Sequence, residues 1–120
     1  MLPPVFKTLT ADAAVVALVA DRIFRHGSAP QGTPVPYFTW QLVGGLPENN
    51  LSELPPFARM AIQVDCWHTD DDGVETLARA VRNAIEPVAC MTGIPVDDRD
   101  PETLNYRIAL QFDWFVGRSA

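Results

Sequence analysis

The densest group of chemically reactive side chains in this sequence is the segment DCWHTDDD, residues 65–72. Cys66 and His68 are two residues apart, so on a β-strand both side chains point to the same face. A thiolate, an imidazole and a carboxylate together suit zinc and other transition metals. Zinc sites usually show two spaced ligand pairs, however, and this segment offers one. Cys66 also continues an alternating apolar row, and aspartates are typical of a helix N-terminus, so a structural role is the favoured interpretation.

Nucleophilic catalysis would require a base beside Cys66 and a third group that orients this base. The two histidines of the chain, His26 and His68, are the candidate bases. His68 lies on the same strand face as Cys66 and offers no oriented third group, so a catalytic arrangement has little support. The chain is therefore expected not to be an enzyme. A small metal-dependent enzyme that uses Cys66, His68 and the neighbouring aspartates is the least favoured alternative.

Two further motifs match binding loops only in part. Gly44 and Gly45 follow a predicted strand, but no helix with a Lys or a Ser/Thr comes next, as a phosphate-binding loop requires. The acidic run of residues 97–102 is interrupted by Arg99 and lacks the glycine and terminal glutamate of an EF-hand loop. We therefore expect no metal and no cofactor, and we interpret the acidic run as a solvated loop.

Strands that would position these residues are indicated by alternation of apolar and polar side chains. Residues 37–43, 58–67 and 104–116 alternate in the way that a half-buried strand requires. The last of these segments has the strongest pattern, with an apolar residue at every second position from Leu104 to Val116. Ile23 and Phe24 predict a further, brief strand.

Helices are indicated at the N-terminus and in the middle of the chain. Pro3 and Pro4 suit the first turn of a short helix, and Thr10 is expected to be the N-cap of a second helix over residues 11–19. A third, amphipathic helix is expected after Thr69 or one of the aspartates 70–72, which would cap it, and Pro87 ends it. Its apolar stripe consists of Val74, Leu77, Val81 and Ile85.

Three connections are expected to lack regular structure. Residues 26–36 are rich in proline and predict a stiff, extended strap. Residues 44–57 are rich in Gly, Pro and Asn, and residues 88–101 contain Gly93, Pro95 and the DDRD run. The whole pattern predicts one α+β domain over residues 1–120, in which a small antiparallel or mixed β-sheet carries helices on one face.

Length, charge and cysteine content exclude several classes of protein. The chain has 120 residues, a length typical of one domain, and a formal net charge of −6 with nine scattered basic residues. Tight binding to nucleic acid is not expected, because phosphate contacts need clustered Lys and Arg, although DNA can pass near an acidic surface without sticking. Two distant cysteines favour a reducing cytosol over a disulfide framework. The N-terminus resembles neither a signal peptide nor a membrane span.

Large aromatic side chains are expected on the face of the sheet opposite the core. Tyr37, Trp67 and Phe115 fall on this face of the three long strands, and we expect them to gather near one end of the sheet. Such a group suggests a contact with another protein, and the unpaired edges of a small open sheet support the same interpretation. Cover by the strap, the termini or the long loop is the alternative.

The order of three segments resembles a known family. These segments are DRIF at residues 21–24, the strap APQGTPVPY at 29–37, and QVDCW at 63–67, which precedes an amphipathic helix. In this order and spacing, and over nearly the whole chain, the sequence resembles the tail completion or tail terminator proteins of long-tailed bacteriophages and prophages.

The resemblance implies a structural virion protein at the junction of tail and head, assembled in the cytoplasm of the bacterial host. Such a protein forms a ring of identical copies, typically a hexamer, on the head-proximal end of the tail tube. There it stops tube growth and presents a surface to the head connector. Its implied partners are further copies of itself, the major tail tube protein and the connector or stopper protein, while DNA passes through the lumen without specific binding. The alternative is another neck or tail-assembly adaptor, which binds connector or tube without terminating it.

The residues expected at protein interfaces come from the aromatic face and from the long glycine-containing loop. They are Tyr37, Gly44, Gly45, Leu46, Leu51, Leu54, Phe57, Trp67 and Phe115.

Overall fold

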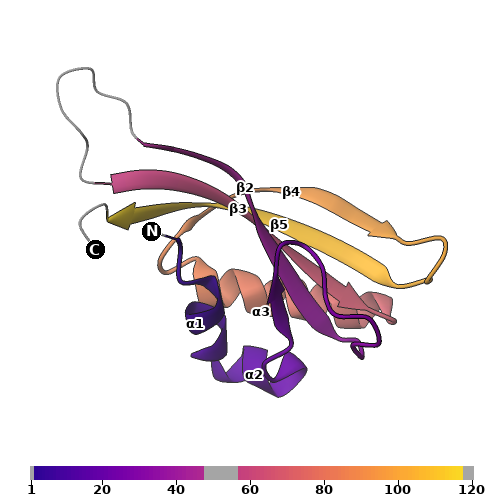
Figure 1. Cartoon of the computed structure of the whole chain (residues 1–120). Helices are drawn as coiled ribbons and strands as arrows, with labels where there is room; N and C mark the ends of the chain where they lie inside the picture. Colours follow the sequence, from indigo (N-terminus) through magenta and orange to yellow (C-terminus); the bar gives the residue numbers. More distant parts are fainter. Residues whose placement is uncertain (1, 48–56, 118–120) are drawn as a thin grey trace.

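The computed structural model describes residues 2–47 and 57–117, and within them a mixed five-stranded sheet with three helices (Figure 1). The elements are α1 (Val5–Thr10), α2 (Ala13–Val19), β1 (Ile23–Arg25), β2 (Tyr37–Pro47), β3 (Phe57–His68), α3 (Asp71–Ile85), β4 (Cys90–Arg99) and β5 (Tyr106–Gly117). The strand order is β1-β2-β3-β5-β4, with β1 parallel to β2 and the other neighbours antiparallel. The predicted α+β class is confirmed.

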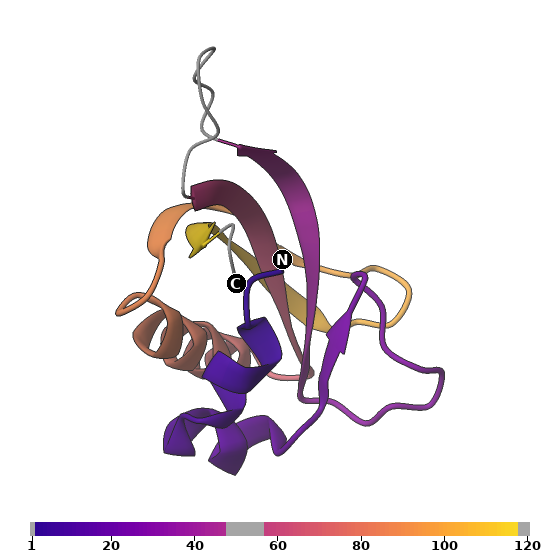
Figure 2. The same ribbon diagram turned by 60° about the vertical axis from the view of Figure 1, so that its left-hand side comes forward.

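All three helices lie on one face of the sheet, which curves over them (Figures 1 and 2). The core forms between this face and the apolar sides of the helices. Its largest fully buried side chains are Phe38, Phe112, Leu9, Ile62, Leu77, Ile85, Val5, Val15, Val19, Val64, Val74 and Val81. The core-facing residues of β3 from Ile62 to Cys66, those of β5 from Ile108 to Trp114 and the stripe of α3 are therefore buried where the sequence predicts them. Leu104, predicted to begin the last buried row, is instead 52% exposed and precedes β5.

The helix caps agree with the sequence at α3 but not at α2. The carboxylate of Asp70 accepts a hydrogen bond from the Gly73 backbone N–H at 2.8 Å, so one of the predicted aspartates caps α3. The prediction that Thr10 caps α2 is wrong. Asp12 is the cap and accepts from the N–H groups of Ala14 and Val15, while the Thr10 hydroxyl donates backwards to the Phe6 carbonyl. Both side chains can cap, and Asp12 stands directly before the first helical residue.

The expected irregular connection over residues 88–101 is wrong, because β4 occupies most of it. Cys90–Arg99 pairs with β5 at the edge of the sheet, and its register shifts twice, between Met91 and Gly93 and between Gly93 and Val96. An edge strand tolerates Pro95 because its outward N–H groups need no partner strand. Glycine and proline in this segment therefore mark irregular pairing and not a loop.

The long strands extend further than their sequence alternation indicates. β2 continues through Gly44 and Gly45 to Pro47, and β3 begins at Phe57, so the connection predicted at residues 44–57 is shorter. A register shift between Leu42 and Gly44 accommodates the glycine pair. At this end β2, β3 and β5 extend past the helices, and the molecule measures 51 × 29 × 24 Å (Figure 1). Leu42, expected on the buried side, is 40% exposed.

The strap between β1 and β2 contains neither helix nor strand, as predicted. It is held to the sheet at its end, where the Nε of Arg22 donates to the Pro36 carbonyl at 2.9 Å. No described helix is long and apolar enough to cross a membrane.

Candidate interaction surface

Cys66 and His68 do not form a reactive pair. Cys66 is fully buried in the core, where burial first and the neighbouring Asp65 carboxylate second raise the pKa of its thiol and keep it protonated. The Nδ1 of His68 accepts a hydrogen bond from the Asp70 backbone N–H at 3.0 Å, directly before α3. Within residues 2–47 and 57–117, no three His, Cys, Asp or Glu side chains are grouped so that they could hold a metal ion. Both cysteines are free thiols, Cys66 buried and Cys90 exposed.

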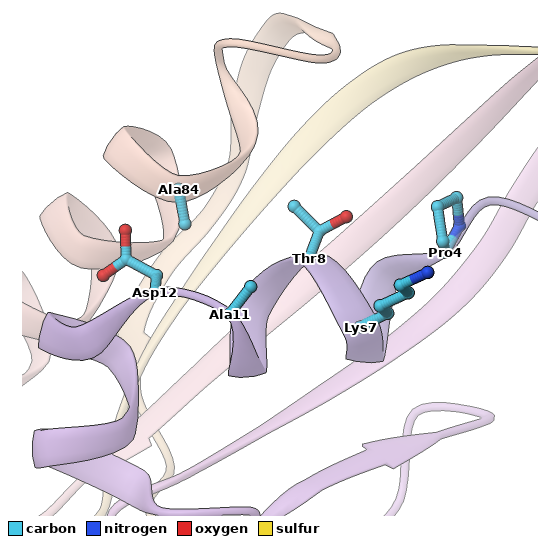
Figure 3. A pocket seen from close by; sticks show the side chains of 6 residues that line it. All are labelled: Pro4, Lys7, Thr8, Ala11, Asp12 and Ala84. Carbon is cyan, nitrogen blue, oxygen red and sulfur yellow. The ribbon is translucent and has the colours of Figure 1, made fainter.

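A shallow pocket lies between α1, the turn that follows it, and α3 (Figure 3). Its lining residues are Pro4, Lys7, Thr8, Ala11, Asp12 and Ala84. The carboxylate in this set is that of Asp12, which already caps α2. The ammonium of Lys7 is then the remaining charged group, and a single amine beside small apolar side chains gives no basis for assigning a ligand or a reaction.

The outer face of the sheet carries a stack of aromatic and guanidinium groups at the end where β2 begins. Tyr37, Trp67 and Arg107 stand side by side on β2, β3 and β5 because Trp67 is the register partner of both others. The rings of Tyr37 and Trp67 are stacked, with centroids 6.2 Å apart and an interplanar angle of 26°. The Arg107 Cζ lies 5.1 Å from the centroid of the Trp67 ring, and Phe24 meets Tyr37 edge to face at 6.3 Å.

A buried polar network holds this stack in place. Asp65 is 4% exposed, and its Oδ2 accepts from Nε and Nη2 of Arg107 at 3.1 and 2.7 Å. Its other oxygen accepts from the Gln63 amide at 2.9 Å. The indole N–H of Trp67 donates to the hydroxyl of buried Thr39 at 3.1 Å. Trp67 and Arg107 thus have few rotamers open to them and present a pre-organised surface.

The sequence did not reveal this network, because alternation places Asp65 and Thr39 on the polar, nominally exposed face. The available signal was the opposite charge of Asp65 and Arg107 on one face of two strands. That signal requires the register of β3 against β5, in which Asp65 and Arg107 are diagonal neighbours. The register was not available from alternation alone.

The nine predicted interface residues do not gather at one place. Tyr37 and Trp67 are in contact, as expected, but Phe115 is register partner of Arg59 near the opposite end of the sheet. The expectation that all three gather at one end is wrong, because antiparallel β3 and β5 carry Trp67 and Phe115 each near its own C-terminal end. Phe115 is 50% exposed.

Four other predicted interface residues lie at or toward the projecting end of the sheet. Gly44, Gly45 and Leu46 lie in β2, and Phe57 is the first residue of β3. Leu51 and Leu54 lie outside the described residues. Exposed Phe115 adds an apolar side chain at this end. The role of all nine residues in an interface stays a prediction.

A family model described as "Tail completion protein gp17" matches residues 3–117 of this sequence. The chain belongs to this family. It is a structural protein of the phage tail, and the predicted resemblance is confirmed. No match was found among the curated proteins.

A solved structure has the same fold as this tail completion protein. A chain of the structure titled "Virion of native gene transfer agent (GTA) particle" aligns with 94% of this chain and 91% of its own length. The TM-score is 0.71 and the sequence identity is 18%. At this identity the match establishes the fold alone, so the roles of the outer-face stack and of the projecting end are argued from the geometry of this tail completion protein.

Proposed function

We propose that this chain forms a ring, most simply a hexamer, on the head-proximal end of the phage tail tube. The ring ends growth of the tube and joins the tail to the head connector, and it acts by contact and not by catalysis. The observation that carries the proposal is the family match over residues 3–117. The head-proximal position and the DNA-filled lumen follow from the family resemblance.

Two features of the fold support a ring. The sheet is open, so its β1 and β4 edges lie on opposite sides of the molecule and leave both sides available for a neighbouring copy. An interface between two different edges is heterologous, and it closes into a ring when the rotation between copies is right. The projecting end of β2, β3 and β5, with exposed Phe115, supplies a second surface for the tube or the connector.

Deletion of the gene from its phage tests this function. We expect DNA-filled heads and unattached tails of abnormal length in electron micrographs of the lysate, and normal virions when the gene is supplied from a plasmid. Tails of normal length that fail to join heads would favour the adaptor that binds without terminating. Normal virions in the absence of the gene would refute both functions.

A further inference from the structure

The two edges of the sheet carry net charges of opposite sign, because Asp97 and Asp98 outnumber Arg99 on β4, and Arg22 and Arg25 outnumber Asp21 at β1. On the β4 edge, Asp97 and Asp98 are exposed, and within the described residues neither takes part in an ion pair. On the β1 edge, Arg22 and Arg25 flank the strand. Arg25 is exposed, its Cζ lies 5.5 Å from the centroid of the Trp40 ring, and it too has no ion-pair partner among the described residues. Each edge therefore presents exposed charge without a direct ion pair, although Asp97 shares a shallow pocket with Arg79 and Arg82 of α3.

These charges lie at matching levels of the sheet. Asp97 is register partner of Ile108, and the row continues through Cys66 and Phe38 to Ile23 of β1. Arg25 is two residues further along β1, which is the diagonal position that a long side chain can reach across two strands.

Both charges also point to the same face. Asp97 shares its row with buried Ile108, and Arg25 follows buried Ile23 by two residues, so each is on the side of the sheet that carries the helices. Arg25 and Asp97 of two adjacent copies can thus meet without crossing the sheet.

Apolar residues of the two edges also lie at corresponding positions along the strands. Met91 of β4 and Leu42 of β2 share one row through Phe112 and Ile62. Ile94, which follows Met91 by three residues and lies within a register shift of β4, is 54% exposed, and Leu42 is 40% exposed. Beyond Arg25, β1 ends and leaves the Leu42 side of β2 without a strand neighbour. A neighbouring β4 edge can therefore bury apolar surface on both copies.

In a ring with cyclic symmetry, residues at similar positions along the strands of adjacent copies can come into contact. A rotation about an axis that runs along the strands leaves the height of every residue unchanged, so residues of one row meet across the interface between adjacent copies. The strand directions also suit this arrangement, since β4 runs antiparallel to β5 and hence opposite to β1 and β2. Pro95 and the register shifts make β4 a poor template for backbone pairing, so side chains carry the contact.

We propose that copies of this chain associate edge to edge, with Asp97, Asp98 and Ile94 of one copy against Arg22, Arg25 and Leu42 of the next. This inference rests on the proposed ring and names the interface that closes it. The second copy is the occupant because both complementary surfaces are present on one chain, on opposite sides of the sheet and within two residues of the same row.

Charge reversal at the two edges tests the interface. Asp97→Arg and Arg25→Asp are each supplied from a plasmid to the phage that lacks the gene, and infectious particles are counted. Each single variant places like charges together at every interface of the ring, so we expect the titre to fall about tenfold or more. The double variant R25D/D97R restores opposite charges and the original net charge, and we expect a titre close to that of the wild type. Supplying both single variants together is expected to restore it as well, because their copies can alternate.

Two controls separate the interface from folding and from net charge. Thr76→Lys with Asn83→Lys adds two positive charges, as Asp97→Arg does, but on exposed positions of α3, and is expected to complement fully. Each purified variant should keep the thermal unfolding midpoint of the wild type within a few degrees. If one unfolds, the neutral variants Arg25→Gln and Asp97→Asn take its place, with a smaller loss expected from each.

The outcomes distinguish this inference from the proposed function. If deletion of the gene leaves the titre normal, the proposed function itself is wrong. If deletion is harmful but folded single variants complement as well as the wild type, the edges do not meet and this inference alone is overturned. A folded double variant that stays as defective as the singles overturns it too.

Discussion

Asp65 and Arg107 show how single residues fix the outer face of the sheet. A carboxylate that is 4% exposed is unfavourable unless it is paired, and Asp65 accepts two hydrogen bonds from Arg107 and one from Gln63. The same arginine lies over the Trp67 ring, so one ion pair sets the position of the aromatic stack. This face can therefore meet a partner without first losing side-chain entropy.

Removal of the Asp65 carboxylate is expected to destabilise the chain. Asp65→Ala leaves Arg107, which is 29% exposed at its side chain, without its counter-charge and leaves the Gln63 amide unpaired. We expect a loss of about 2 kcal/mol in the free energy of unfolding, measured by urea denaturation. The matched control is Glu75→Ala at an exposed site on α3, for which a change under about 0.5 kcal/mol is expected. Equal effects of the two substitutions would contradict the role given to Asp65.

The two thiols are expected to differ in reactivity. Cys66 is buried with a raised thiol pKa, and Cys90 is exposed on β4. A thiol reagent at neutral pH should modify one cysteine in the native chain and two in denaturant, because the thiolate is the reactive form. Cys90→Ser should reduce the native count to zero.

The pH dependence follows from the same shift. The unfolded chain loses the Cys66 proton at lower pH than the folded chain, so the contribution of this thiol to stability is complete below the unfolded pKa and is lost as the pH rises above it. Cys66→Ala should remove that alkaline loss. A native chain in which Cys66 reacts as fast as Cys90 would contradict the burial described here.

Among the elements, α3 depends on a cap that the sequence predicts. Asp70→Ala removes the acceptor for the Gly73 N–H, and we expect the free energy of unfolding to fall by about 1 kcal/mol. Asp71→Ala is the matched control, since it removes a carboxylate from the first turn that caps no N–H, and its cost should be a few tenths of a kcal/mol. A thermal or urea melt of both variants measures the difference. Indistinguishable melts would mean that the Asp70 carboxylate stabilises α3 only through its interaction with the helix dipole and not through the hydrogen bond to Gly73.

The extent to which the elements were predictable depends on what decides each one. Helix α3 and strand β5 are decided by local periodicity, and both were predicted. Strand β4 is decided by pairing with β5, and its Gly93 and Pro95 give the local signal of a loop. The extension of β2 through Gly44 and Gly45 is likewise a consequence of pairing with β3. Tertiary context thus overrides local preference at the edge and at the projecting end of the sheet.

The candidate site was also predictable only where local alternation decides the position of a residue. Tyr37 and Trp67 were assigned to the correct face because alternation fixes the face of each residue. Their neighbours Asp65, Thr39 and Arg107 join the site through the register between strands, which alternation does not contain. The misplaced Phe115 has the same cause, since its height on the sheet depends on strand direction. The face on which a side chain lies follows from the alternation within one strand, whereas its position along the sheet follows from how two strands pair.

For the whole molecule, the distribution of surface properties matters more than any one residue. Net charges of opposite sign lie on the two edges, the aromatic stack lies at one end of the outer face, and exposed Phe115 lies near the other end. A subunit of a closed ring needs two complementary sides and two distinct ends. The edges and ends of this chain are consistent with the proposed ring between a tube and a connector.

The net charge of the whole chain predicts that it does not bind duplex DNA. Binding to DNA gains free energy when clustered Lys and Arg release counterions from phosphates. Here the net charge is −6, and among the described residues Arg59, Arg82 and Arg107 already pair with carboxylates. Fluorescence anisotropy of a labelled duplex should stay unchanged on titration with the protein at about 0.15 M salt, the physiological ionic strength.

The dependence of the anisotropy on salt concentration distinguishes an acidic surface from a weak basic patch. Lowering the salt strengthens every favourable contact with phosphate, so a weak basic patch would become visible as a saturable rise in anisotropy at low ionic strength. For an acidic surface the long-range repulsion grows instead, and no rise is expected at either salt concentration. A basic duplex-binding protein titrated in parallel verifies the probe. Saturable binding that weakens with added salt would show that the chain binds DNA. A ring lumen lined by this chain would then hinder the passage of DNA that the proposed function requires.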